Sequence, residues 1–300
     1  MRIGIVILNY KTWEKTISCV ESIESTYKEP KVIVVVDNAS PNDSYERLTE
    51  AYRDNSEVVV VETGKNGGFS FGNNFGFNYI QAEYSDVEHV VLTNNDIIFL
   101  PDTLEKLVAG FNIRDNIALT APLILDVNQN KTNNPWKKKP TLLQLFRFKS
   151  RKGCFYEWDE LSSPTPVYMV SGCCFVVSVD KYECIGKLDE NVFLYNEENI
   201  LSWRIASKGF ECMAIPDAPI IHDHGTTTGR SNLFVDKEYV KSSLYYCRTY
   251  EELGRFNLLL FWMYLMAKIM MKCFCGKYAS RKGLGLVIVE TLESCRNLMK

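Results

Sequence analysis

The sequence predicts an α/β fold in which a central sheet is covered by helices on both faces. Over about residues 1–125, short runs rich in Val and Ile alternate with stretches of helical length. The strand-like runs are continuously apolar, a pattern typical of parallel strands that are buried on both faces. Strand–helix repetition at this spacing is typical of a doubly wound sheet.

The expected elements follow one another along the chain. Strands are predicted at 3–8, 31–36, 57–61, 88–93 and 117–121, and helices near 12–25, 43–54, 71–83 and 102–112. From about 126 to 165, polar and proline-containing segments predict a loop or insertion with a short helix near 141–148. Strand-like runs return on both sides of Ser171-Gly172, and a helix near 196–208 and a strand at 212–215 follow. From about residue 234 the chain is expected to be helical.

Composition and charge narrow the class of protein. The chain has 300 residues, 46% of them hydrophobic, which is enough for a sizeable core. A net charge of −3 argues against a nucleic-acid-binding protein, which usually carries a basic patch. The ten cysteines include no Cys-x-x-Cys pair, so we expect reduced cytosolic thiols rather than zinc ligands or disulfides. The N-terminus enters a predicted strand at once and lacks a signal-peptide pattern, which also favours the cytoplasm.

Asp96 follows a predicted strand in the segment Asn94-Asn95-Asp96. The carboxyl ends of strands in open α/β sheets face the crevice in which ligands bind. A carboxylate there suits Mg²⁺ or Mn²⁺; Mg²⁺ takes few protein ligands and completes its shell with water and substrate phosphates. We therefore expect Asp96 to hold a divalent cation bound to a nucleotide diphosphate. The alternative is a plain turn, since Asn and Asp are common turn residues.

Two further strands end in polar residues at the same predicted edge, the first at Asn9 and the second at Asp37-Asn38. An ionised Asp37 accepts hydrogen bonds and could take the imide N–H of a uracil or thymine ring, or it could cap the next helix or turn. A glycine-rich stretch at 64–76 follows the third strand. It matches neither Gly-x-Gly-x-x-Gly nor the phosphate-binding loop of ATPases, which weakens the dinucleotide and ATPase functions.

Glu197 and Glu198 open the predicted helix near 196–208. A fixed carboxylate at this position could remove a proton from a sugar hydroxyl as a general base. Acidic residues at a helix start are otherwise partners of the helix dipole, so a structural role is the alternative. His222 and His224 flank an aspartate, which indicates either a metal ligand or a structural pair.

Taken in order, these motifs resemble glycosyltransferase family 2 enzymes of the GT-A fold, in particular the rhamnosyltransferase-like branch. The resemblance covers about residues 1–250 and rests on the order of short elements that are weak individually. They are Ile5-Val6-Ile7-Leu8-Asn9-Tyr10, Val36-Asp37-Asn38-Ala39-Ser40, Asn66-Gly67-Gly68, Asn74-Phe75-Gly76, Asn94-Asn95-Asp96, Ser171-Gly172, Tyr195-Asn196-Glu197-Glu198, His222 with Gly225, and Tyr245-Tyr246 with Arg248. The resemblance implies a GT-A type fold, which is a Rossmann-like mixed sheet flanked by helices.

The resemblance also implies an inverting transfer of a sugar from a dTDP- or UDP-sugar to a hydroxyl of a glycan or lipid-linked acceptor, as in cell-surface polysaccharide synthesis. Glu198 would be the catalytic base with Glu197 beside it, and Asp96 and His222 would bind Mg²⁺ or Mn²⁺. The other positions divide between the two substrates. The nucleotide-sugar set is Asn9, Asp37, Asn38, Asn66, Gly67, Asn74, Asn94 and Asn95, and the acceptor-side set is Ser171, Gly172 and Trp203.

Three positions depart from the family pattern. Asn94 stands where the family has the first Asp of Asp-x-Asp, and Glu198 replaces an Asp. Ile200 stands where relatives often carry another Asp. These changes leave Asp96 as the one acidic ligand and leave the donor sugar open.

The chain is expected to divide into a catalytic domain at 1–232 and a helical C-terminal extension at 233–300. The catalytic domain would have a nucleotide-binding half, about 1–125, and an acceptor half, about 126–232. In the extension, the apolar run Leu258–Met271 is shorter than the ~18–20 residues that cross a bilayer. Lysines lie beside that run, so 256–282 is expected either to lie on the cytoplasmic face of a membrane or to pack on the catalytic domain or a dimer partner.

Two other functions stay open from the sequence alone. A sugar nucleotidyltransferase would need a glycine-rich, arginine-containing loop after the first strand, whereas Asn9-Tyr10-Lys11-Thr12-Trp13 has neither residue type. A non-catalytic nucleotide-sugar-binding domain with a decayed site is the other alternative. Asn94 and Ile200 favour decay, and the presence of Asp96 with the glutamate pair argues against it.

Overall fold

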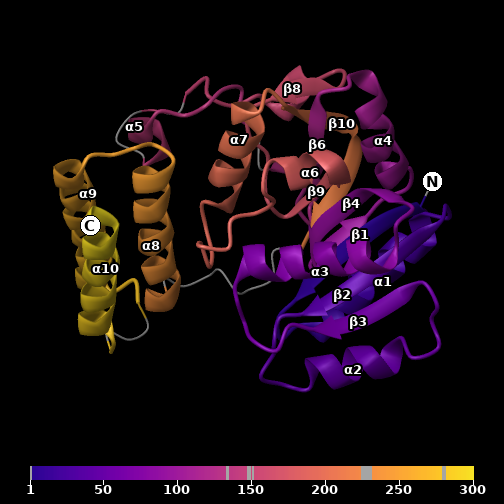
Figure 1. Ribbon diagram of the computed structural model, residues 1–300, viewed down its shortest axis with the longest axis horizontal. Helices are drawn as coiled ribbons and strands as arrows, with labels where there is room; N and C mark the ends of the chain where they lie inside the picture. Colours follow the sequence, from indigo (N-terminus) through magenta and orange to yellow (C-terminus); the bar gives the residue numbers. More distant parts are fainter. Residues whose placement is uncertain (1, 133–134, 147–149, 151, 224–231, 279–281) are drawn as a thin grey trace.

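A computed structural model describes residues 2–132, 135–146, 150, 152–223, 232–278 and 282–300. It confirms the predicted fold class: a ten-stranded mixed sheet is flanked by helices, and three further helices follow at the C-terminal end. In Figure 1 these last helices stand beside the sheet, with α7 (Glu197–Ser207) between them and the strands. His224 and Gly225, which the sequence analysis singled out, lie outside the described residues.

The first four strands form a parallel sheet in the order β3-β2-β1-β4. The elements are β1 (Arg2–Asn9), α1 (Trp13–Thr26), β2 (Lys31–Asp37), α2 (Ser44–Ala51), β3 (Val58–Glu62), α3 (Phe69–Glu83) and β4 (Val87–Asn94). Ile5 and Ile7 pack in one core cluster with residues of α1 and α2, whereas Val6 packs in a second cluster with residues of α3. Successive residues of a strand point to opposite faces, so a sheet covered on both sides needs apolar residues at every position.

The second half of the sheet mixes strand directions. The strands are β5 (Ile97–Phe99), β6 (Ile117–Leu125), β7 (Lys131–Thr132), β8 (Thr165–Val167), β9 (Cys174–Ser178) and β10 (Glu211–His222). Strand β9 runs antiparallel between β4 and β6, and β10 runs parallel to β6. The 212–215 strand predicted from the sequence is the start of the longer β10, which continues beyond a register shift between Ile215 and Pro219. The helices here are α4 (Thr103–Ala109), η1 (Gly110–Ile113), α5 (Leu142–Leu145), η2 (Trp158–Glu160) and α6 (Val179–Cys184).

Strand β5 determines where the site forms. It follows Asp96 directly, but it pairs antiparallel with β10 rather than with β4, and Ile97 lies opposite His222 in this pairing. No strand was predicted at Ile97–Phe99 from the sequence, where the predicted strand ended at 93. Only Asn95 and Asp96 separate β4 from β5, so the end of β10 must lie near the end of β4, and Asp96 lies in the connection between them.

The C-terminal helices share a core of their own. They are α8 (Leu233–Thr249), α9 (Arg255–Phe274) and α10 (Leu284–Met299). Their buried side chains form one cluster that also takes in Ile200 of α7. The position that departs from the family pattern is thus a packing residue in this chain, completely buried between α7 and the extension.

Helix α9 is longer than the fourteen-residue apolar run suggested. It has 20 residues, and an 18-residue window within it has a mean hydropathy of 1.3 and is 33% buried. By length and composition it is one helix that could cross a bilayer among the described residues. The core helix of a soluble protein meets the same criterion, so length alone assigns no membrane span.

Gly68 joins the glycine-rich stretch to the loop before α7. It adopts φ 89° and ψ −174°, a conformation that residues other than glycine essentially avoid. A Cβ at this position would lie 2.2 Å from the carbonyl oxygen of Phe193. The next backbone N–H, that of Phe69, donates a 2.9 Å hydrogen bond to the same oxygen. The absent side chain allows the two backbones to meet.

Gly68→Ala is therefore expected to lower the free energy of unfolding by about 3 kcal/mol or more, because backbone strain adds to a backbone clash. Urea unfolding measures the change. Gly64→Ala is the matched control, since Gly64 also has a positive φ of 72° but has no atom within 4 Å of an added Cβ. It should cost about 1 kcal/mol. Equal losses in the two variants would show that contact with Phe193 does not matter.

Candidate active site

Asp96 and His222 form an ion pair at the edge of the sheet. The Nε2 atom of His222 lies 3.2 Å from Oδ1 of Asp96, and the side chains are 7% and 22% exposed. Burial alone would lower the pKa of His222, but hydrogen bonds to Asp96 and Cys173 outweigh it and raise the pKa to about 10. The protonated imidazole is thus the positive partner of the Asp96 carboxylate at the point where β5 meets β10, and a cation bound by the pair would replace its Nε2 proton.

This pair fits a divalent cation as part of a ligand set. A hard carboxylate and an imidazole supply two donors, and Mg²⁺ commonly takes one or two protein ligands and completes its shell with water and phosphate. In the described part of the chain, no three His, Cys, Asp or Glu residues cluster to form a closed metal site. The chemistry of the pair therefore suits a cation that arrives with a diphosphate rather than a permanent structural ion.

Asn9 and Asp37 lie at the carboxyl ends of adjacent parallel strands, as the sequence predicts. The register pairs Asn9 with Asp37, and it places Leu8 opposite Asn94 on the other side. Both Asn9 and Asp37 are fully buried, and Nδ2 of Asn9 donates a 2.7 Å hydrogen bond to Oδ2 of Asp37. The other Asp37 oxygen accepts a 2.7 Å bond from the Ser40 backbone N–H. Both Asp37 oxygens thus accept hydrogen bonds from within the protein at this edge of the sheet.

Asn95 joins the same buried network from the metal side. Its Nδ2 lies 3.0 Å from Oδ1 of Asn9 and 2.9 Å from Oγ1 of Thr16. The Thr16 hydroxyl in turn donates to Oδ1 of Asn9. Asn94, in contrast, makes no side-chain hydrogen bond within the described residues and is half-buried. Of the two asparagines, Asn95 holds the loop and Asn94 has an amide available to a ligand.

Asn38, Asn66 and Asn74 hold the glycine-rich stretch in place. Nδ2 of Asn38 donates to Oδ1 of Asn66 at 3.1 Å and to the Gly68 carbonyl at 3.0 Å. Asn74 bonds to both backbone groups of Leu188, and its amide also meets Tyr182 and a nearby glutamate. All polar atoms of Asn74 are thus engaged inside the protein, which indicates a positioning role. A Cβ on Gly67 would strike the ring of Phe71, so that glycine is needed for packing.

The two glutamates at the start of α7 have different environments. Glu197 is 7% exposed, and its Oε2 has no hydrogen-bond partner among the described residues. Burial and the Glu198 charge raise the pKa of Glu197 well above its usual value. Glu198 is half-buried, so a substrate can reach it, and burial raises its pKa as well. A raised pKa brings a carboxylate closer to the range in which a general base works best.

Gly172 lies against Glu198. Its backbone N–H donates a 3.3 Å hydrogen bond to Oε1 of Glu198, and an added Cβ would lie 3.0 Å from the same oxygen. The neighbouring Cys173 carbonyl accepts a 2.8 Å bond from the Asn94 N–H. The segment 171–173 therefore links the end of β4 to the start of α7. The end of β4 and the start of α7 were predicted from the sequence to share one site. The segment 171–173 makes a hydrogen bond to each of them.

Of the three predicted acceptor-side residues, Ser171 and Gly172 belong to the segment 171–173, and Trp203 lies further along α7. Ser171 contacts the Cys173 sulfur through its hydroxyl at 3.4 Å. Trp203 lies two turns along α7, where its ring packs edge-on against Tyr250 at 5.2 Å. This ring contact joins Trp203 to the C-terminal end of α8.

Asp189 is a buried residue that sequence reasoning missed. Its Oδ2 accepts a 3.0 Å hydrogen bond from Tyr245 and lies 3.0 Å from Nη2 of Arg204. Burial opposes its ionisation, but hydrogen bonds from Tyr250 and Asn191, with the Arg204 charge, lower its pKa below the usual value. Asp189 thus fixes the loop before α7 to α8. The Tyr245-Tyr246 motif was the available signal, since a buried tyrosine hydroxyl needs a partner.

A comparison with known families shows what kind of protein carries this site. Residues 4–186 match the family model described as glycosyl transferase family 2. The chain belongs to glycosyl transferase family 2. The matched span includes Asp96 and ends before Glu198 and His222. Membership supports glycosyl transfer over the nucleotidyltransferase alternative.

Two curated relatives have glycosyl-transfer activities in their names. The chain is 27% identical over 197 residues to the low-salt glycan biosynthesis hexosyltransferase Agl10 of Haloferax volcanii, covering 65% of this chain and 59% of that protein. It is 23% identical over 224 residues to an N-acetylglucosaminyl-diphospho-decaprenol L-rhamnosyltransferase of Mycobacterium tuberculosis, covering 70% of this chain and 72% of the relative. The chain thus spans well under two thirds of the haloarchaeal protein.

Solved structures of glycosyltransferases share the fold. A crystal structure of GalNAc-T7 with UDP, GalNAc and Mn²⁺ superposes with a TM-score of 0.58 at 18% identity, covering 84% of this chain and 49% of that chain. A crystal structure of TarS from S. aureus superposes with a TM-score of 0.54 at 14% identity, covering 83% of this chain and 40% of that chain. At these identities the likeness establishes the GT-A type fold.

Proposed function

We propose that this family 2 glycosyltransferase is a metal-dependent, inverting enzyme that uses a dTDP- or UDP-sugar as donor. The observation that carries the proposal is the pairing of Asp96 with His222 at the carboxyl edge of the sheet, linked through Gly172 and Cys173 to Glu198. The names of the two relatives support a hexose or deoxyhexose such as rhamnose as the transferred sugar. The acceptor would be a hydroxyl on a glycan or a lipid-linked sugar.

Glu198 acts as the base in this proposal. It takes the proton of the acceptor hydroxyl, whose oxygen attacks the anomeric carbon on the face opposite the diphosphate. The bond to the diphosphate breaks, and the bonding electron pair leaves with it. One displacement inverts the centre, so one base suffices and no covalent carboxylate partner is needed. Glu197 is buried behind Glu198, and its charge would favour proton uptake by the pair.

Asp96 and His222 would hold the cation, which would neutralise charge on the departing diphosphate. Asn94 would meet the nucleotide-sugar directly with its half-buried amide. The buried network of Asn9, Asp37 and Asn95 would support the nucleotide side, and Asn38, Asn66 and Gly67 would shape the loop beside it. Asn74 would position that loop, whereas Ser171, Gly172 and Trp203 would lie on the acceptor side. We keep the division into a catalytic domain at 1–232 and an extension at 233–300, because α8, α9 and α10 supply most of the buried residues of one hydrophobic cluster.

The extension would bring the enzyme to the cytoplasmic face of a membrane. One side of α9 exposes large apolar side chains along its length, and α10 adds two exposed apolar residues near its start. The α9 residues are Phe256, Leu260, Met263, Met271 and Phe274, and the α10 residues are Leu286 and Val289. Such a surface with lysines beside it is typical of helices that lie in a membrane interface.

Asp96→Ala is expected to abolish metal-dependent donor binding, because it removes the anionic ligand. Thermal shift of the full chain with UDP- and dTDP-sugars, with and without Mn²⁺, measures this. Asn94→Ala should keep most of the Mn²⁺-dependent shift, since an amide contributes less to a cation. Equal losses in the two variants would mean that Asp96 is not the leading ligand.

Glu198→Gln is expected to reduce the transfer rate by about 10²–10⁴-fold while donor binding is kept. Glutamine retains an Oε1 acceptor for the Gly172 N–H, so the change removes the base without removing its support. In the wild-type enzyme, turnover should fall as the pH drops through the raised pKa of Glu198, because the protonated form cannot accept a proton. The acid limb should therefore lie above the usual glutamate range. Unchanged turnover in the variant would refute the role of Glu198.

Membrane contact is tested by replacing exposed side chains, because removing α9 would open the shared core. Phe256→Ser with Phe274→Ser should lower co-flotation with anionic phospholipid vesicles several-fold, since each phenylalanine is more than 70% exposed and buries apolar area on binding. Ile113→Ser, at an exposed site on η1, is the control. Flotation that is the same for all three proteins would count against the membrane proposal.

A further inference from the structure

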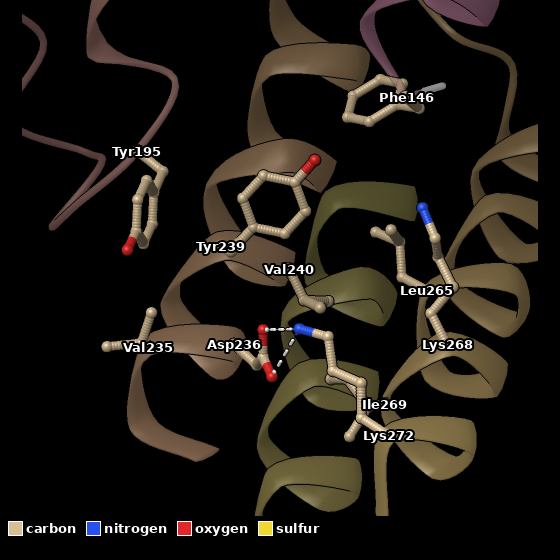
Figure 2. Close-up of a pocket in the computed structure, with 10 residues that line it drawn as sticks. All are labelled: Phe146, Tyr195, Val235, Asp236, Tyr239, Val240, Leu265, Lys268, Ile269 and Lys272. Atoms are coloured by element: carbon tan, nitrogen blue, oxygen red, sulfur yellow. Dashed lines mark hydrogen bonds and ion pairs between the residues drawn. The ribbon is translucent and has the colours of Figure 1, made fainter. Parts of the chain in front are cut away.

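A pocket of about 480 Å³ lies where the extension meets the loop before α7. Its volume is within the range of small-molecule sites. Tyr195, three residues before Glu198, forms one wall, and its ring packs edge-on against Tyr239 of α8 at 5.8 Å. Val240, Leu265 and the other lining residues come from α8, α9 and the α5 region (Figure 2).

The pocket contains two lysines in different situations. Lys272 lies 2.7 and 3.0 Å from the two oxygens of Asp236, so its charge is neutralised. Lys268 forms no ion pair with a carboxylate in the described part of the chain, and its ammonium lies 4.7 Å from the centre of the Tyr264 ring. Figure 2 shows the Lys272 ammonium directed at Asp236, whereas the Lys268 ammonium points away from that pair. The pocket therefore offers one uncommitted positive charge, which suits an anion.

A second pocket, of about 360 Å³, adjoins the first. Phe146 lines both pockets, and Tyr264, the ring beside Lys268, lines the second. Apart from Asn257, its walls are almost wholly apolar, with Leu143 and Leu260 at 56% and 44% exposure. An anion held by Lys268 could thus continue into an apolar chain on the far side of Phe146.

The Tyr195 side of the first pocket is connected to α7, the helix that carries the glutamate pair. Tyr195 and Asn196 both have left-handed φ values, 71° and 64°, a strained conformation that surrounding contacts must hold. Nδ2 of Asn196 lies 3.2 Å from the hydroxyl oxygens of Ser242 and Ser243 on α8. The loop that presents the glutamate pair is therefore anchored to the helix that forms the pocket, so a ligand in the pocket lies close to α7.

We propose that the two pockets bind the acceptor, and that the acceptor is a sugar joined through a phosphate or diphosphate to a long apolar chain. The anion lies at Lys268, the apolar chain lies in the pocket lined by Leu143, Phe146 and Leu260, and the sugar extends past Tyr195 toward Glu198. This rests on the proposed glycosyl transfer and specifies the acceptor class. An isolated anion would use Lys268 alone, and the adjoining apolar pocket favours an amphiphile.

The test measures equilibrium binding of three probes to the full chain by calorimetry, with EDTA present so that divalent cations do not bind the diphosphate elsewhere. Farnesyl diphosphate carries both groups, inorganic pyrophosphate carries the anion alone, and farnesol carries the chain alone. Farnesyl diphosphate should bind at least tenfold more tightly than either fragment. Lys268→Gln should weaken it about tenfold, as expected for a lost charged hydrogen bond, and leave farnesol unchanged. Leu260→Gln should weaken both farnesyl probes.

Lys208→Gln is the matched control, because it removes the same charge from an exposed turn after α7. Wild-type affinity in Lys268→Gln, an equal loss in Lys208→Gln, or equal affinity for pyrophosphate and farnesyl diphosphate would overturn the acceptor proposal. The Mn²⁺-dependent thermal shift with nucleotide sugars is measured on the same preparations. If the wild-type chain shows no Mn²⁺-dependent shift, the proposed donor chemistry fails while the pocket result still stands. The two failures are therefore distinguishable.

Discussion

The antiparallel pairing of β5 with β10 is the constraint on which the site depends. Asp96 leaves a buried parallel strand at the centre of the sheet, and three residues of β5 then pair with the end of β10 at the sheet edge. That pairing sets Ile97 opposite His222 and brings the histidine to 3.2 Å from the Asp96 carboxylate. A slip of one residue would turn the side chains of β5 to the other face, and the pair would be lost.

Buried hydrogen bonds position the rest of the site relative to this strand pairing. Asp37 is fully buried and needs donors on its oxygens, so Asn9 and the Ser40 N–H are held close to it. Asn95 and Thr16 extend the same network to the loop that carries Asp96. These residues are polar for a structural reason as well as for any ligand they meet. A substitution among them would disturb the edge of the sheet before it disturbed a contact with substrate.

The C-terminal helices support the helix that carries the glutamate pair. Ile200 of α7 is buried in their core, Asp189 is bound by two tyrosines of the α8 end, and Asn196 meets two serines of α8. The glutamate pair therefore stands on a helix that is supported from both sides. The same arrangement leaves exposed apolar side chains of α9 and the two adjoining pockets facing outward. The proposed base and the proposed acceptor pockets therefore meet at α7.

The sequence by itself determined the sheet and the edge on which polar residues gather. Continuous apolar strands can be buried only between two helical layers, and parallel strands bring their carboxyl ends to one edge, so Asn9, Asp37 and Asn94 had to lie level. Short-range pattern also located α7 and its two glutamates, because acidic residues favour a helix start. Other features of the site were decided only by the tertiary structure. The pairing partner of β5 and the use of Asn74 and Asn95 as internal supports depend on contacts between residues far apart in the chain. The same holds for the burial of Glu197 rather than Glu198, and for Lys268, which has no carboxylate partner among the described residues. Such contacts are fixed by packing and burial, which local sequence does not encode.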